Sequence, residues 1–308
     1  MHYRIIVLRR VVFIEPVCVL RALWGFLASI SVLSCSAKIE TEPRGYDIID
    51  DISNNIDDLK DTLVIGQWNI GHFSGGSSPN STIRGKEYTA LVAQCRSIIS
   101  SLSADIISLN EFSVVIGTDN SNIQYKAEDE LFQDYDFRYI GHQSRYSCNA
   151  LFSKVELLDC NEQVYECNQT AQITHTSVIK ATDYYLVESI ILLKGVKTVF
   201  VSTHLAFDKN NEDVACNQIR ELIEKYKDEE HIFICGDWNI FDVHNFNLFT
   251  EAGYQIANHS KYGDFDTWDG GAVLDNIIVK GYDIVDVKMI NTATSISDHN
   301  PIVVKFLL

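Results

Sequence analysis

Short apolar runs that each carry an acid, an amide or an imidazole at or near one end are the feature that most restricts how this chain can fold. The runs and their polar ends are Leu63–Trp68 with Asn69, Ile106–Leu109 with Asn110 and Glu111, Val199–Thr203 with His204, Ile232–Gly236 with Asp237 and Asn239, the run from Val273 with Asp275, and the last strand with Asp298 and His299 before it. Apolar runs of this length are typical of buried strands. Because a sheet is a rigid scaffold, side chains at its strand ends can converge on one place. The pattern therefore predicts a sheet protein with a site at the strand ends.

Helical patterns between the strands are few. Helical spacing of apolar residues predicts helices at 87–102 and 211–226 and a short one at 246–252, whereas 184–193 and 196–205 form a predicted hairpin. Further strands are predicted at 137–140, 150–152, 155–158, 284–289 and 302–306. Many strands, hairpins and few helices favour an α/β sandwich with mixed sheets. No linker is visible within 62–308, which we take as one domain.

The N-terminal residues 1–36 differ from the rest and predict a targeting leader. Arg4, Arg9, Arg10 and Arg21 precede an apolar run over 22–33. A bilayer span takes about 20 residues, so this run is too short to span comfortably but suits a signal peptide. The following Val32-Leu33-Ser34-Cys35 resembles a bacterial lipoprotein cleavage box, with Cys35 as the lipidated residue. We expect an exported lipoprotein, and a plain secretory signal or an uncleaved signal anchor is the alternative.

Acidic residues dominate the composition and the segment after the leader. The chain of 308 residues has 42 Asp and Glu against 25 Lys and Arg, a formal charge of −17. Residues 37–61 are polar and acidic, and we interpret them as a tether. Such a charge argues against a protein that coats nucleic acid, which needs a basic face. It does not exclude an enzyme that meets phosphates through a metal ion, because the ion supplies local positive charge.

Each polar strand end has an ordinary explanation when it is considered singly, because Asp, Asn and Gly also close strands in turns. Asp275 is harder to explain in this way, since it lies between Leu274 and Ile277 in an apolar run. A buried carboxylate is costly without a partner, and a histidine is the natural one.

The ordered set resembles the endonuclease/exonuclease/phosphatase superfamily of DNase I-like metal-dependent phosphoesterases. The motifs that carry the resemblance are Gln67-Trp68-Asn69-Ile70, Ser108-Leu109-Asn110-Glu111, Ser202-Thr203-His204-Leu205, Gly236-Asp237-Trp238-Asn239, Leu274-Asp275-Asn276-Ile277 and Ser297-Asp298-His299-Asn300-Pro301, with a weaker match at Cys148-Asn149-Ala150-Leu151-Phe152-Ser153-Lys154. The resemblance covers about residues 62–308. It implies a four-layer α/β sandwich, with two packed mixed sheets flanked by helices. It also implies a Mg²⁺-dependent hydrolase of phosphate esters.

The resemblance also implies roles for single residues. Glu111 is the main expected metal ligand, with Asn69 and Asp298 holding the metal or its waters. Mg²⁺ suits such a set of carboxylate, amide and water oxygens, and Mn²⁺ can replace it.

The expected catalytic residues are His299, oriented by Asp275, together with His204, Asp237 and Asn239. His204 contacts a phosphate oxygen or protonates the leaving group, and which group accepts the proton of the attacking water stays open.

Substrate contacts are expected from Asn149 and Arg145, with a solvated loop charge as the equal alternative for Arg145. His72 is a weaker candidate for reaching substrate, and Trp268 is interpreted as packing at the core or the rim.

The sequence leaves the substrate open. A nuclease is one hypothesis, although no long basic insertion is available to grip duplex DNA. A lipid or inositol phosphate substrate fits an anchor at Cys35. A non-catalytic binding protein on the same scaffold is the third hypothesis, and the presence of Glu111, Asp237 and His299 disfavours it. We expect a monomer.

Overall fold

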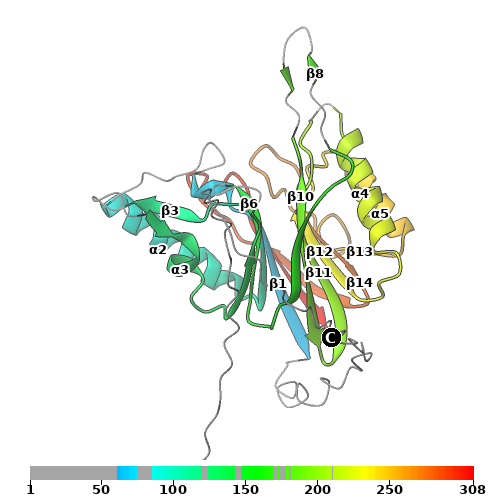
Figure 1. The fold of residues 1–308 in the computed structure, drawn as a ribbon, viewed down its shortest axis with the longest axis horizontal. Coiled ribbons are helices and arrows are strands. Elements are labelled where there is room, and N and C mark those ends of the chain that lie inside the picture. The colour runs from blue at the N-terminus through cyan, green and yellow to red at the C-terminus, as the bar shows by residue number, and fades with distance from the viewer. Residues whose placement is uncertain are drawn as a thin grey trace, which may run out of the picture. The chain divides into compact units, whose positions relative to one another are not determined.

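Two six-stranded mixed sheets form the centre of the protein (Figure 1). The computed structural model describes residues 61–74, 85–118, 124–142, 147–168, 172–173, 178–179, 182–209 and 211–308. The predicted leader, Cys35 and nearly all of the predicted tether lie outside these residues. Within them, no helix is both long and apolar enough to cross a membrane.

The first sheet has the strand order β15-β16-β1-β2-β6-β5. Its strands are β1 (Thr62–Asn69), β2 (Ile106–Phe112), β5 (Phe137–Ile140), β6 (Cys148–Ser153), β15 (Asp283–Met289) and β16 (Ile302–Leu307). Strands β1 and β2 are parallel, and the remaining neighbours are antiparallel.

The second sheet has the strand order β13-β14-β12-β11-β10-β7. Its strands are β7 (Leu158–Val164), β10 (Tyr185–Leu193), β11 (Val196–His204), β12 (Ile232–Asp237), β13 (Gln255–Ile256) and β14 (Asp275–Lys280). Here β11 and β12 are the parallel pair. Two small ribbons, β3 (Val115–Thr118) with β4 (Gln124–Lys126) and β8 (Gln172–Ile173) with β9 (Val178–Ile179), lie outside both sheets.

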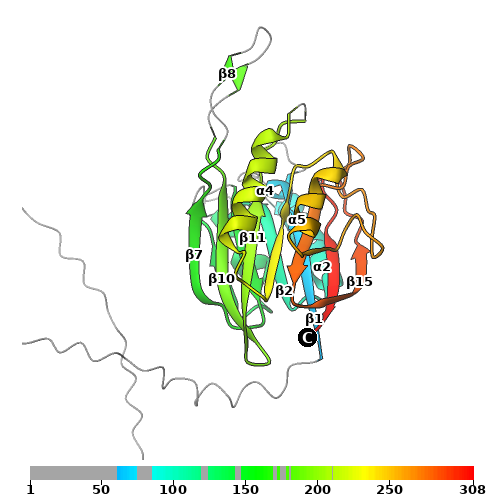
Figure 2. The ribbon, with the colours of Figure 1, turned by 90° about the vertical axis from the view of Figure 1, so that its right-hand side faces the viewer.

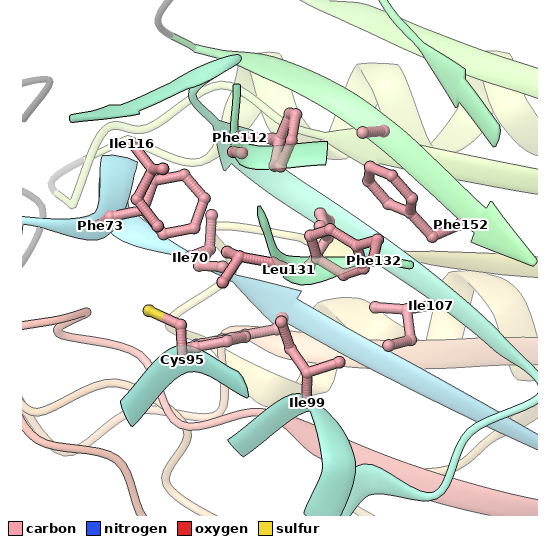
Figure 3. Close-up of a cluster of buried hydrophobic side chains, with 14 of the residues drawn as sticks. Ile70, Phe73, Cys95, Ile99, Ile107, Phe112, Ile116, Leu131, Phe132 and Phe152 are labelled. Atoms are coloured by element: carbon pink, nitrogen blue, oxygen red, sulfur yellow. The ribbon is translucent and has the colours of Figure 1, made fainter. Parts of the chain in front are cut away.

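Helices cover the outer face of each sheet, as Figures 1 and 2 show. The first sheet packs against α2 (Gly85–Leu102) and α3 (Ala127–Leu131), and the second against α4 (Asp213–Lys225) and α5 (Asn247–Glu251). Two short 3-10 helices, η2 (Gly71–Phe73) and η3 (Val243–Phe246), complete the elements of the described residues. Figure 3 shows part of the layer between the first sheet and its helices, where Cys95 and Ile99 of α2 face Ile107 and Phe132. The predicted four-layer sandwich is confirmed.

A third apolar layer fills the space between the two sheets. Leu63 and Ile65 of β1 meet Phe200 of β11 and Phe233 of β12 there. Successive residues of a strand point to opposite faces of its sheet. The odd-numbered residues of β1 and β12 therefore point inward between the sheets, and the even-numbered ones point toward the helices.

Most sequence-predicted elements are present, and one strand is misplaced. The prediction of a strand at 155–158 is wrong, because the strand spans Leu158–Val164. The Oγ of Ser153 donates to the carbonyl oxygen of Val155 at 2.6 Å and accepts from its N–H at 2.9 Å, which makes a turn at this point. The edge strand β7 is mostly polar, so its sequence has little apolar signal.

Candidate active site

The inward faces of six strands become polar at one end of the sandwich. Following the inward positions gives Leu63, Ile65 and then Asn69 on β1, Phe233, Cys235 and then Asp237 on β12, and by the same alternation Asn110 on β2, Asn149 on β6, His204 on β11 and Asp275 on β14. Four of these strands end at this edge and two begin there. The site is thus the polar end of the layer whose other end is the apolar core.

Asp237 lies at the centre of this polar cluster. Its Oδ2 accepts a hydrogen bond from Asn69 Nδ2 at 2.8 Å and lies 3.5 Å from Nε2 of His204 and 3.7 Å from Nε2 of His299. Its Oδ1 accepts from the backbone N–H of Asn239 at 3.0 Å. Burial raises the pKa of Asp237, although both imidazoles act in the opposite direction. One carboxylate therefore joins residues of both sheets.

His299 is held by a buried carboxylate, as its sequence position suggested. Its Nδ1 lies 2.7 Å from Oδ2 of Asp275, which is fully buried, and its backbone N–H donates to Ser297 Oγ at 3.0 Å. Burial disfavours the charged imidazole, but Asp275 and Asp237 outweigh it and raise the pKa of His299 to about 10. Since Nδ1 is engaged, Nε2 is the nitrogen that faces the cluster.

Glu111 reaches the cluster because the backbone of β2 is irregular. One residue is inserted between Leu109 and Phe112 relative to β6, and Glu111 has φ 49°. Such a bulge re-aims a side chain, which strict alternation would have pointed to the face of Leu109. Its Oε2 lies 2.9 Å from Nε2 of His72. Burial alone would raise its pKa, but the hydrogen bond from His72 and the imidazole of His204 lower it to about 2.

The donor set around Glu111 suits a hard divalent cation. Glu111 is ionised, keeps 22% of its side chain exposed and hydrogen-bonds to Asn69. Asp298, the third predicted ligand, accepts from Trp268 Nε1 at 3.3 Å. Among the residues that the structure describes, no group of three or more His, Cys, Asp or Glu side chains could hold a metal ion, so the protein would supply fewer such ligands than a closed cage has. An open site of this kind is how Mg²⁺ usually binds, through one or two carboxylates, waters and substrate phosphates.

The two predicted substrate contacts have different outcomes. Asn149 is buried, and its Nδ2 donates to the carbonyl oxygen of Tyr185 at 2.7 Å while its Oδ1 accepts from Asn110 at 2.8 Å. The amide therefore links the two sheets, and a contact with substrate stays a prediction. Arg145 lies outside the described residues. Asn239 donates through Nδ2 to the carbonyl oxygen of Leu205 at 2.9 Å, which fixes its loop.

Asn110 is a site residue to which the sequence pattern assigns no role. Its Nδ2 donates to Asn149 and to the carbonyl oxygen of Thr203 at 2.7 Å, and its Oδ1 accepts from Gln67 at 2.7 Å and from the N–H of Asp237 at 2.8 Å. An amide at an inward position next to the strand end is the signal that could have identified it. The side chain ties the strands that hold the site.

We expect Asn110→Ala to lower the free energy of unfolding by more than about 3 kcal/mol, because each buried polar group left unpaired costs about 1–3 kcal/mol. Urea denaturation of the variant and the parent protein measures this difference. Asn217→Ala, at an exposed position of α4, is the control and should change stability by at most about 0.5 kcal/mol. A loss below about 1 kcal/mol for Asn110→Ala would mean that water replaces the network.

An aromatic rim borders the cluster on the side of the second sheet. It consists of Phe207, Phe241 and Trp268. Phe207 is 50% exposed, the ring centroid of Phe241 lies 5.9 Å from that of each of the other two, and Lys209 Nζ lies 5.7 Å from the ring centroids of Phe241 and Trp268. Trp268 packs at this rim and also contacts Asp298.

A two-sheet sandwich with paired acid, amide and imidazole groups at one end defines the DNase I-like class of phosphoesterases. The sequence profile of the Endonuclease/Exonuclease/phosphatase family matches residues 66–299. The chain belongs to this family and is a hydrolase of the phosphoesterase type.

Solved structures share the fold at low sequence identity. A humanized D. rerio TDP2 matches with a TM-score of 0.55 and 18% identity, over 80% of this chain and 99% of its own. A mannosyl-6-phosphatase of Bacteroides thetaiotaomicron VPI-5482 matches with a TM-score of 0.54 and 13% identity, over 80% of this chain and 100% of its own. The human nocturnin catalytic domain matches with a TM-score of 0.53 and 15% identity, over 80% of this chain and 95% of its own. No curated protein sequence matches the chain significantly.

Proposed function

We propose that this protein is a divalent-metal-dependent hydrolase of phosphate esters that is exported to the cell envelope. The observation that carries the proposal is the position of Asp237. Its buried Oδ2 is bordered by His204, His299 and Asn69, and the ionised Glu111 is in turn hydrogen-bonded to Asn69. Acidic and imidazole groups held together in this way suit acid–base chemistry next to a cation.

Mg²⁺, or Mn²⁺ in its place, is the proposed cofactor. Glu111 and Asn69 would hold it, and Asp298 is the third predicted ligand. When bound, the ion neutralises charge on the phosphate and makes a bound water more acidic.

The side chains of this protein account for the other requirements of the reaction. Hydrolysis joins a water oxygen to phosphorus and breaks the bond from phosphorus to the ester oxygen. One proton therefore leaves the water, and one reaches the leaving oxygen. His299, protonated and held by Asp275, donates from Nε2 to a phosphate oxygen. Asp237 orients the water or accepts its proton, and His204 protonates the leaving oxygen.

A phosphodiester or a phosphate monoester of a nucleic acid, a lipid or an inositol is the proposed substrate class. One protein of similar fold is described as a mannosyl-6-phosphatase, and a D. rerio TDP2 of similar fold was solved with a single-stranded DNA product. The leader and Cys35 support a monomer that is attached to a membrane by a lipid. Attachment to a membrane favours a lipid or inositol phosphate as the substrate. The net charge of −17 disfavours a grip on duplex DNA.

Removal of divalent ions should abolish turnover. The purified full-length protein is assayed on bis(p-nitrophenyl) phosphate, plasmid DNA and phospholipid vesicles with Mg²⁺, with Mn²⁺ and with EDTA. We expect hydrolysis of at least one substrate with metal, a loss of at least about 10²-fold with EDTA, and recovery when metal is added back. Turnover that persists in EDTA would refute the metal dependence, and no turnover on any substrate would favour the non-catalytic binding protein.

A further inference from the structure

The loop that follows β1 is held in an unusual backbone conformation. His72 has φ 54° and Phe73 has φ 62°, and both are in the left-handed region that residues other than glycine rarely occupy. Glu111, on β2, is in the same region with φ 49°. Residues in this region tend to occur where function requires them. Two separate segments therefore adopt unfavourable backbones at the point where they meet.

One aromatic contact holds both segments in place. Phe73 and Phe112 are fully buried, and their rings meet edge to face with centroids 5.9 Å apart (Figure 3). Phe73 follows His72, and Phe112 follows Glu111. The N–H of Gly71 also donates to Oδ1 of Asn69 at 3.1 Å. The packing therefore fixes the two backbones from which His72 and Glu111 project.

The result is an imidazole nitrogen next to the main expected metal ligand. Nε2 of His72 lies 2.9 Å from Oε2 of Glu111, and the two side chains are 14% and 22% exposed. Small divalent ions such as Mg²⁺ and Zn²⁺ bind nitrogen and oxygen ligands at about 2.0–2.2 Å. Adjacent ligands of an octahedral ion with such bonds lie about 3 Å apart. The observed separation therefore matches two adjacent ligands of one ion.

We propose that His72 is a nitrogen ligand of the divalent ion at Glu111, so that the site selects Mn²⁺ over Mg²⁺. This inference rests on the metal dependence in the proposed function. Mg²⁺ prefers oxygen ligands, whereas first-row transition ions also accept imidazole. A site of Glu111, Asn69 and waters alone would not discriminate in this way. The opposing explanation is that His72 only positions the Glu111 carboxylate through a hydrogen bond.

A variant that exchanges nitrogen for oxygen separates the two explanations. His72→Asn keeps a polar side chain, and asparagine tolerates the left-handed backbone better than most residues. The matched control is His259→Asn. His259 also has a positive φ, 71°, and its Nδ1 lies 3.1 Å from Oδ1 of Asp264. The thermal midpoint of each variant shows whether the fold is retained.

Binding of Mn²⁺ and Mg²⁺ to the full-length protein is measured by calorimetry, and Mn²⁺ bound below one equivalent is examined by pulsed electron paramagnetic resonance. In the parent protein we expect a ¹⁴N coupling and tighter binding of Mn²⁺ than of Mg²⁺. In His72→Asn the coupling should weaken or vanish, and the Kd for Mn²⁺ should rise at least about 10-fold while that for Mg²⁺ changes less than about 3-fold. His259→Asn should match the parent protein in both measurements.

Three results would overturn the assignment. An unchanged ¹⁴N coupling in His72→Asn would exclude His72 as a ligand. If His72→Asn bound both Mn²⁺ and Mg²⁺ more weakly by the same factor, His72 would be only a positioning residue for Glu111. If neither ion bound the parent protein, the metal dependence of the proposed function itself would be refuted, and the ligand assignment with it.

Discussion

His299→Asn is expected to lower kcat by about 10²–10⁴-fold, the range for loss of a positioned proton-transfer group or transition-state donor. The substitution removes Nε2, which faces Asp237, but asparagine can still donate to Asp275 from the position of Nδ1. This donor matters because Asp275 is fully buried. Leaving a buried charge without its partner typically costs about 3–5 kcal/mol, so alanine would confound activity with stability. The measurement is kcat on bis(p-nitrophenyl) phosphate with saturating metal, together with the urea midpoint.

The control for this substitution is His231→Asn. His231 precedes β12, at the opposite end of the strand from Asp237, and its ring packs against Tyr282. It should retain the parent rate. If His299→Asn also kept a rate within about 3-fold of the parent, His299 would have no part in the chemistry.

Glu111→Gln should weaken binding of the activating ion by at least about 10²-fold and lower kcat/KM at a fixed metal concentration by a similar factor. Gln has nearly the shape of Glu but no charge, and the low pKa of Glu111 shows that its surroundings favour the charged form. Calorimetry with Mg²⁺ and Mn²⁺ measures the loss directly. Raising the metal concentration should restore part of the activity, because the remaining ligands are intact.

Glu130→Gln is the matched control for Glu111→Gln. Glu130 is also a partly exposed carboxylate, 28% accessible, but it pairs with Arg96 at 3.4 Å on the helical side of the first sheet. Its removal should leave metal affinity unchanged. Equal metal affinity in Glu111→Gln and the parent protein would show that the cation does not bind at Glu111.

The parts of this fold that follow periodic rules could be predicted from the sequence. Strands such as β12 have a strongly apolar sequence, and the Asp within the apolar run of β14 indicates a histidine partner by its position alone. The alternation of side chains along a strand is enough to predict that Asp237 points inward, because Phe233, Cys235 and Asp237 share one face. These features depend on local sequence and strand alternation alone.

Other features depend on contacts between distant segments and could not be predicted. The bulge that turns Glu111 inward is visible only when β2 is paired with β6. The four hydrogen bonds of Asn110 reach β1, β6, β11 and β12, so no sequence window contains them. His72 is a weak candidate by sequence because a loop histidine is usually solvated, and the contact between Phe73 and Phe112 that fixes it was not predictable.

The polar cluster is divided between two separate sheets. Asn69, Glu111 and His299 come from the first sheet and its loops, whereas His204, Asp237 and Asp275 come from the second. Side-chain contacts such as Asn69 to Asp237 and His299 to Asp275 cross the interface here, whereas backbone ladders stay within each sheet. Sliding of one layer over the other would therefore separate the reacting groups while both layers kept all their backbone bonds. When packing between the two sheets is weakened, the catalytic rate should therefore fall before circular dichroism shows any loss of secondary structure.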